Sequence, residues 1–357
     1  MTRHFLRDDD LTPAEQADIL DLAAELKRDR FGSKPLAGPQ TVAVIFDKSS
    51  TRTRVSFAVG IADLGGSPLI ISTANSQLSG KETASDTARV LERQVAAIVW
   101  RTYAQSGLQE MALGTTVPVV NALSDEFHPC QLLADLLTIR EHRGELAGLT
   151  VTFLGDGASN MGQSYLLACA TAGMHVRVAA PATYAPDKAV VADAQAIAAR
   201  TGGSATVLTD PVEAVTGADI VVTDTWVSMG KEDEKAARVK VFGGYQVDQA
   251  LMAHAKPDAL FLHCLPADRG YEVAADVIDG PQSVIWDEAE NRLHAQRRFW
   301  SGSFVSSSPQ HRASGDRHGV PQVPRLNSNH EPKEKKWRNA LCSHIQAVST
   351  PRWASAG

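Results

Sequence analysis

The sequence predicts an α/β protein with two doubly wound parallel-sheet domains and an active site in the cleft between them. Short apolar runs alternate with helical stretches along most of the chain, a pattern typical of parallel strands connected by helices. The chain of 357 residues is long for a single domain, and its 43% hydrophobic content is enough for two cores.

The first domain is assigned to residues 1–143. It opens with an amphipathic helix over residues 11–30, for which Thr12 and Glu15 provide a capping box. A long amphipathic helix over residues 129–143 completes the domain. Between these helices, apolar runs predict strands at residues 42–46, 69–71, 96–99 and 117–120.

The second domain is assigned to residues 144–296, where the alternation of strands and helices starts again. Helices are expected, among others, over residues 159–172 and 187–201. Strands are expected at residues 149–154, 176–179, 205–208, 219–223, 259–262 and 283–286. Ligand sites of such sheets lie beyond the carboxyl ends of the strands, so polar motifs that directly follow a strand are the candidates for chemistry.

Residues 297–357 differ in composition from the rest of the chain. They contain ten Lys or Arg, three Asp or Glu, ten Ser and five Pro, without sustained apolar periodicity. Such a segment cannot bury enough apolar surface to offset the entropy of ordering it. We therefore expect a poorly ordered, atypical basic tail that leaves apolar side chains of the first helix, around Ile19, Leu20 and Leu22, uncovered.

Composition and charge exclude several classes of protein. The net charge of −6 argues against a nucleic-acid-binding protein. No apolar run approaches the ~20 residues of a membrane span, and the polar first ten residues do not resemble a signal peptide. The scattered cysteines form no CxxC pair, which predicts a cytoplasmic protein without structural zinc.

Hydroxyl and guanidinium groups are concentrated in residues 50–54 (Ser-Thr-Arg-Thr-Arg), between a predicted strand and a predicted helix. The first turn of a helix has unpaired N–H groups and a positive dipole end. This segment therefore predicts an anion site suited to a phosphate. It lacks the glycine spacing of a nucleotide P-loop, and a capped helix with solvated arginines is the alternative.

Three further residues of the first domain follow predicted strands. Arg101 could reach the cleft or be an ordinary surface charge. His128 can donate to a carbonyl oxygen, although a loop histidine before proline is more often structural. Gln131 offers both an amide donor and an acceptor.

The second domain offers polar groups after its strands. Residues 155–160 half-match a dinucleotide fingerprint, but Asn160 replaces the third glycine and no acidic residue ends the next strand, which weakens an NAD interpretation. Asp224 suits a ligand ammonium group, or it caps a turn. Cys264, beside His263, lacks further ligands at the spacing of a zinc site.

Together and in this order, these motifs resemble the aspartate/ornithine carbamoyltransferase family over about residues 6–296. Residues 50–54, 101–102 and 128–131 are similar to its carbamoyl phosphate signature. Asp268 stands where bacterial members usually have histidine. Similarity to the ornithine branch, and not the aspartate branch, is carried by Asn160, Asp224, Ser228-Met229-Gly230, His263-Cys264-Leu265-Pro266 and Arg292.

The resemblance implies a carbamoyl phosphate-binding first domain and an ornithine-binding second domain. The implied reaction transfers the carbamoyl group of carbamoyl phosphate to the side-chain amine of L-ornithine, giving L-citrulline and phosphate for arginine biosynthesis. It implies a homotrimer and a reaction without metal or cofactor. Two alternatives stay open: a carbamoyltransferase for another amine such as putrescine, and an inactive product whose altered C-terminus prevents assembly.

The resemblance also implies residue roles. The catalytic groups would be Arg101, His128, Asp224 and Cys264. Carbamoyl phosphate would be bound by Ser50, Thr51, Arg52, Thr53, Gln77, Arg101, His128, Gln131, Cys264, Leu265 and Arg292. Ornithine would be bound by Asn160, Asp224, Ser228 and Met229.

Overall fold

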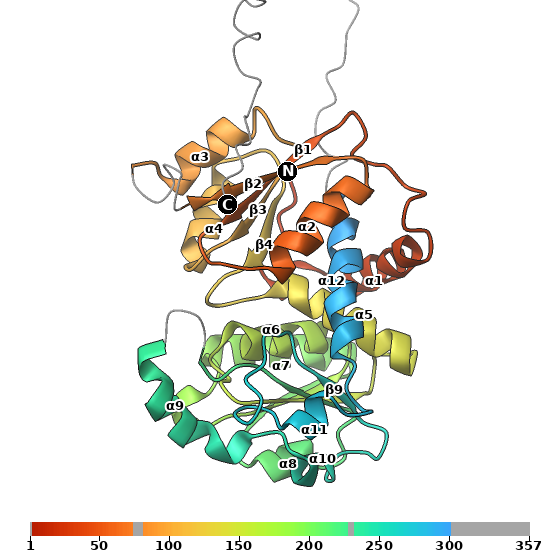
Figure 1. The fold of residues 1–357 in the computed structure, drawn as a ribbon, viewed down its shortest axis with the longest axis vertical. Helices are drawn as coiled ribbons and strands as arrows, with labels where there is room; N and C mark the ends of the chain where they lie inside the picture. Colours follow the sequence, from red (N-terminus) through yellow and green to blue (C-terminus); the bar gives the residue numbers. More distant parts are fainter. Residues whose placement is uncertain (1, 74–80, 228–231, 301–357) are drawn as a thin grey trace, which may run out of the picture. The chain divides into compact units, whose positions relative to one another are not determined.

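A computed structural model describes residues 2–73, 81–227 and 232–300, which lie in one compact unit, Met1–Pro309. It contains two parallel sheets, which confirms the predicted fold class (Figure 1). The first sheet has the strand order β2-β1-β3-β4 and the second the order β7-β6-β5-β8-β9. The order reverses between β1 and β3 and between β5 and β8, and such switch points are where ligands bind in sheets of this kind.

The apolar runs form the strands because the inner strands of both sheets are buried between helices, whereas the edge strands β2 and β7 are partly exposed. The strands of the first sheet are β1 (Thr41–Phe46), β2 (Ser67–Ser72), β3 (Ala97–Arg101) and β4 (Val119–Leu123). Those of the second are β5 (Thr150–Leu154), β6 (His175–Ala179), β7 (Ser204–Leu208), β8 (Ile220–Thr223) and β9 (Leu260–Leu262).

The helices begin at the signals seen in the sequence. Thr12 and Glu15 form the expected capping box before α1. Ser159 and Asp187 cap α6 and α7 through their side chains. The helices are α1 (Pro13–Arg28), α2 (Arg52–Asp63), α3 (Ala84–Leu91), α4 (Gln105–Leu113), α5 (Pro129–Arg143), α6 (Asn160–Thr171), α7 (Lys188–Thr201), α8 (Pro211–Val215), α9 (Lys235–Phe242), α10 (Gln249–Met252), α11 (Ala275–Ile278) and α12 (Ile285–Arg297). None of the helices in the described ranges is long and apolar enough to cross a membrane.

The strand expected at residues 283–286 is wrong. Only Ser283 pairs with the sheet, through an isolated bridge to Phe261, and α12 already starts at Ile285. The apolar run is short, and Asp287 and Glu288 follow it. Acidic side chains favour the first turn of a helix, so they extend the helix backwards over the apolar residues.

Helix α12 follows the second sheet in sequence but packs against α1, α2 and α5 of the first half (Figure 1). Gly60 of α2 permits this close approach, because a Cβ there would lie 3.1 Å from Cγ of Arg297. Arg297 Nη1 donates to the carbonyl of Leu26 at 2.8 Å. The end of the second domain is therefore built into the first.

The packed chain continues past the predicted boundary at residue 296. The 3₁₀ turn η7 (Arg298–Trp300) buries Phe299 and Trp300, and the Phe299 ring lies 5.1 Å from that of Phe5. Ile19 and Leu20 are each only 1% exposed. The expectation that the tail starts at residue 297 and leaves these side chains uncovered is wrong. Phe299 and Trp300 belong to the same hydrophobic core as Ile19 and Leu20. Residues 301–357 lie outside the described residues.

Candidate active site

A cavity of about 570 Å³ lies at the switch points of both sheets. Its walls are formed by segments that follow β1, β3 and β4 of the first sheet and β5, β8 and β9 of the second. Eleven predicted site residues line it: Ser50, Thr51, Arg52, Thr53, Arg101, His128, Asn160, Asp224, Cys264, Leu265 and Arg292. Gln77, Ser228 and Met229 lie outside the described residues.

The N-terminus of α2 forms the anion-binding side of this cavity. Thr51 precedes the helix, and the N–H of Thr53 donates to Oγ of Ser50 at 3.3 Å. Arg292, from α12, donates to Oγ1 of Thr53 at 2.5 Å. The arrangement brings a guanidinium group from the end of the chain to the positive end of α2, as a phosphate site requires.

Arg101 is the last residue of β3 and is 7% exposed. Its Nε has no hydrogen-bond partner among the described residues. Burial, followed by repulsion from Arg292, lowers the pKa of Arg101 to about 10. Two buried guanidinium groups close enough to repel each other are stabilised by an anion between them.

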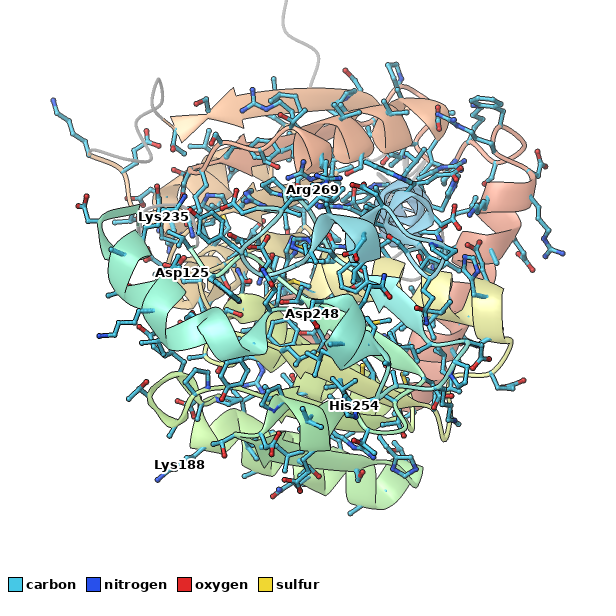
Figure 2. The ribbon with its side chains drawn as sticks, turned by 60° about the horizontal axis from the view of Figure 1, so that its bottom comes forward. Asp125, Lys188, Lys235, Asp248, His254 and Arg269 are labelled. Carbon is cyan, nitrogen blue, oxygen red and sulfur yellow. The ribbon has the colours of Figure 1, made fainter. Side chains whose placement is uncertain are left out.

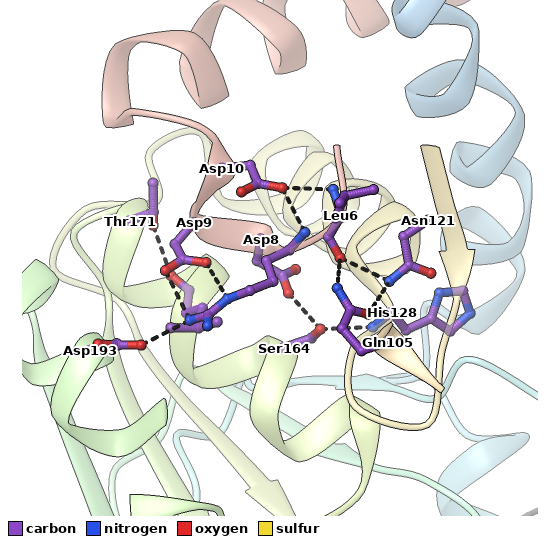
Figure 3. Close-up of polar contacts among 12 residues, drawn as sticks. Leu6, Asp8, Asp9, Asp10, Gln105, Asn121, His128, Ser164, Thr171 and Asp193 are labelled. Carbon is purple, nitrogen blue, oxygen red and sulfur yellow. Dashed lines mark hydrogen bonds and ion pairs between the residues drawn. The ribbon is translucent and has the colours of Figure 1, made fainter. Parts of the chain in front are cut away.

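His128 is held through its backbone, which leaves its ring available. Its N–H donates to Oγ of Ser164 at 2.9 Å, and Ser164 donates to Asp8 at 2.6 Å (Figure 3). Nδ1 of the ring has no hydrogen-bond partner among the described residues. Burial and the charges of Arg292 and Arg101 lower the pKa of His128 well below its usual value. The imidazole is therefore neutral at physiological pH and has one N–H to donate.

The opposite side of the cavity carries acceptor and thiol groups. Asn160 opens α6, and its side chain donates to the carbonyl of Ser124 at 2.7 Å. Cys264 donates to Oδ1 of Asp224 at 3.3 Å. Burial raises the pKa of Asp224, and burial together with Asp224 raises that of Cys264 well above its usual range. Cys264 is therefore a thiol and not a thiolate nucleophile.

Asp224, His263 and Cys264 bring possible metal ligands within 4.8 Å of one another. Nδ1 of His263 is engaged by the protein, because it accepts from the N–H of Leu265 at 2.9 Å. Nε2 lies 3.3 Å from Oε1 of the buried Glu272. This geometry favours a structural role for His263.

Two family models match the chain. The model of the aspartate/ornithine carbamoyltransferase carbamoyl-P binding domain matches residues 3–141, and that of the Asp/Orn binding domain matches residues 147–298. The chain belongs to the aspartate/ornithine carbamoyltransferase family. Both domains of the family are therefore present, in the order that the sequence motifs indicated.

Known carbamoyltransferases agree with this assignment. An ornithine carbamoyltransferase from Clavibacter michiganensis subsp. michiganensis is 81% identical over 297 residues, which are 83% of this chain and 97% of the relative. The Leifsonia xyli enzyme of the same name is 70% identical, over 83% of this chain and 95% of the relative. The solved structure of ornithine carbamoyltransferase from Pyrococcus furiosus is similar to this fold, with a TM-score of 0.80 and 48% identity over 83% of this chain and 95% of that one.

Gln131 is placed differently from the other predicted residues of the carbamoyltransferase site. It is fully buried on α5 and is not among the residues that line the cavity. Its Nε2 donates to Asp135 and Glu288, whereas its Oε1 has no partner among the described residues. A buried acceptor without a partner is costly unless a ligand satisfies it.

The sequence did not single out several residues that the structure places in this carbamoyltransferase site. Lys48 lines the cavity and forms an ion pair with Asp125, which lies in the loop after β4 (Figure 2). Lys48 could have been found, because it lies only two residues before Ser50. Asp125 gave no comparable signal in the sequence.

Arg238 was also missed, and it connects two loops that follow strands of the second sheet. From α9, its Nη1 donates to Oδ2 of Asp156 at 2.7 Å and to the carbonyl of Trp226 at 3.0 Å. Asp156 follows β5 and Trp226 follows β8, so one buried guanidinium group fixes the segments after both strands. Nothing in the local sequence around Arg238 distinguishes it from a surface arginine.

Proposed function

We propose that this protein transfers the carbamoyl group of carbamoyl phosphate to the side-chain amine of L-ornithine, forming L-citrulline and phosphate. The observation that carries the proposal is that residues from both sheets line the same cavity. Arg52, Arg101 and Arg292 provide a cationic side, and Asn160 and Asp224 face the same cavity from the second sheet. High identity to proteins named ornithine carbamoyltransferase supports ornithine as the acceptor.

The phosphate group would bind at the start of α2, to Ser50, Thr51, Arg52 and Thr53, with Gln77 and Arg292 completing the site. Arg101 would contact both the phosphate and the carbonyl oxygen, and neutral His128 would donate to that oxygen. The amine nitrogen then bonds to the carbonyl carbon, the bond from this carbon to the phosphate oxygen breaks, and one amine proton is transferred to the phosphate. The protein accelerates this by positioning and by stabilising the oxyanion.

The amino-acid end of ornithine would bind to the second domain. Asn160 and the backbone of Met229 would hold its carboxylate, and Asp224 and Ser228 its α-amino group. The thiol of Cys264 would lie beside the reacting amine as an uncharged group, consistent with its raised pKa. The carbonyl of Leu265 and Oε1 of Gln131 would accept from the carbamoyl NH₂ group. Norvaline, which lacks the reacting amine but keeps the α-amino acid end, should therefore compete with ornithine. Failure to compete would favour a putrescine-type acceptor.

The decisive test is a citrulline assay on the purified full chain with size-exclusion chromatography and light scattering. We expect ornithine- and carbamoyl phosphate-dependent citrulline without added metal or cofactor, and a species of three times the 38.2 kDa chain mass. The proposal also places the enzyme in the cytoplasm and in arginine biosynthesis. An assembled trimer without citrulline formation would refute the activity, whereas a monomer without activity would support the assembly-defective alternative.

The rate should rise with pH. A free alkylamine has a pKa near ~10, so its reactive neutral fraction increases about tenfold per unit between pH 6 and 8.5. His128 has a pKa well below its usual value, and it therefore stays neutral over this range and adds no opposing effect. We expect kcat/KM for ornithine to increase, while the inhibition constant of norvaline changes little. A flat kcat/KM profile would contradict deprotonation of the amine as the limiting factor.

A further inference from the structure

Two buried carboxyl groups, Asp135 and Glu288, meet where α5 contacts α12. Asp135 is fully buried and Glu288 is 1% exposed. Gln131 lies one helical turn before Asp135, and its Nε2 donates to Oδ1 of Asp135 at 2.8 Å and to Oε1 of Glu288 at 3.0 Å. The NH₂ group of Gln131 is thus fully used by the two carboxyl groups.

The other oxygen of each carboxyl group is fixed by a donor from the second half of the chain. The hydroxyl of Tyr165, on α6, donates to Oδ2 of Asp135 at 2.6 Å. The N–H of His263 donates to Oε2 of Glu288 at 2.9 Å. Each carboxyl group therefore has only one oxygen to offer to Gln131, and neither can turn away without losing a buried hydrogen bond.

This network determines which way the Gln131 amide points. Turning the amide by half a rotation would aim its carbonyl oxygen at two carboxyl oxygens, and three buried acceptors would then face one another. Burial raises the pKa of both Asp135 and Glu288, and the charge of Asp135 raises that of Glu288 further. The observed contacts of Nε2 with Oδ1 of Asp135 and Oε1 of Glu288 favour the orientation in which the carbonyl oxygen of Gln131 points away from the pair.

Glu288 also acts on the second proposed acceptor of the carbamoyl group. It holds the backbone of His263, two residues before Leu265, and the N–H of Leu265 donates to the His263 ring. Leu265 has φ of 57°, the one positive φ of a non-glycine residue in the described parts of the chain. A bulky residue is strained in this conformation, so its surroundings must hold it there.

We propose that Asp135 and Glu288 are positioning residues that select the acyl group of the acyl phosphate. They hold Gln131 with its carbonyl oxygen towards the substrate, so that the substrate must present an N–H at this point. The inference rests on the proposed function, in which Gln131 and Leu265 accept from the carbamoyl NH₂. An acetyl group has a methyl there and would leave both acceptors unsatisfied, which disfavours its binding.

The test compares two non-reactive ligands that differ only at this point. Phosphonoacetamide carries an NH₂ group beside its carbonyl, and acetonylphosphonate carries a methyl. Binding of each to the full chain is measured by isothermal titration calorimetry. For the unaltered protein we expect phosphonoacetamide to bind about tenfold or more tightly than acetonylphosphonate, because only it satisfies the two acceptors.

The decisive variant is the double substitution Asp135→Asn and Glu288→Gln. The oxygens of the new amides stay with the Tyr165 hydroxyl and the His263 N–H, so their NH₂ groups face Gln131. Gln131 should then turn its own NH₂ towards the substrate. We expect the preference for phosphonoacetamide to fall to about twofold or less, while the affinity for acetonylphosphonate changes by less than about threefold.

Thr138→Val is the matched control. Thr138 accepts from Asn291 across the same α5–α12 contact, at 2.9 Å, and its own hydroxyl donates to the carbonyl of Ala134. This variant should keep the full preference. If the double variant loses its fold by circular dichroism, Glu288→Gln alone is expected to lower the preference in the same direction.

Two results would overturn the inference: a preserved preference in the folded carboxyl variants, or an equal loss of affinity for both ligands, which would indicate a purely structural role. If the unaltered protein binds neither phosphonate, the proposed carbamoyl phosphate site itself is wrong. If it binds both equally, only the assignment of Gln131 and Leu265 as acceptors fails.

Discussion

Replacing Arg101 by alanine is expected to lower kcat by ~10²–10³, the usual effect of removing one oxyanion donor. Arg101 is a buried cation whose Nε has no partner among the described residues, and it lies beside Arg292 at the cavity. Its contact with the oxyanion forms only as the amine attacks, so KM for ornithine should change little. Steady-state kinetics of citrulline formation, with both substrates varied, would measure the effects on kcat and on KM separately.

Arg89→Ala is the control for this experiment, because the Arg89 side chain is 67% exposed on α3. It should have normal kinetics. An Arg101→Ala enzyme that retains more than about a tenth of the normal kcat would show that Arg101 does not stabilise the transition state as assigned.

Trp300→Ala is expected to destabilise the protein by ~3–5 kcal/mol, the usual cost of truncating a buried tryptophan. Trp300 is 1% exposed and packs in the same core as Phe5 and Ile19. For a chain of this size the melting temperature should fall by roughly 10 °C. Differential scanning fluorimetry is a suitable measurement.

Trp286→Ala provides the comparison within α12, because Trp286 is 66% exposed. Surface substitutions of this kind usually change stability by about 0.5 kcal/mol or less. Equal melting temperatures for the two variants would mean that η7 does not contribute to the core, and that the packed chain ends near residue 296 as first expected.

The fold was largely predictable because its determinants are local. The capping box of Thr12 and Glu15 lies within four consecutive residues, and both it and the helix after it are present as predicted. The strands could be recognised from their apolar runs, since helices cover both faces of each parallel sheet. The wrong prediction of a strand at residues 283–286 also has a local cause. A short apolar run is too short to show the periodicity that distinguishes a strand from the buried start of a helix.

The candidate site was predictable only where its residues form compact motifs. Residues 50–53 and Asn160 lie in the segments that follow strands, and this position along the chain was enough to predict that they line the cavity. Arg54 does not line it, and its guanidinium group lies over the ring of Phe46. Arg238 reaches Asp156 from a position 82 residues later in the sequence, and Lys48 reaches Asp125 over 77 residues. Such pairs arise from the tertiary fold, and a single sequence contains no spacing rule that would reveal them.

The packing of α12 on the first half of the chain has a consequence for synthesis on the ribosome. Arg292 must reach Thr53 across 239 positions, and Arg297 must reach Leu26 across 271. At ~5–20 residues per second, the nascent helices α1 and α2 wait from roughly ten seconds to a minute for the helix that packs against them. During that time the apolar faces of α1 and α2 are exposed to chaperones and to neighbouring nascent chains. Release of residues 285–300 from the exit tunnel, and not domain-by-domain folding, therefore determines when the anion site can first form.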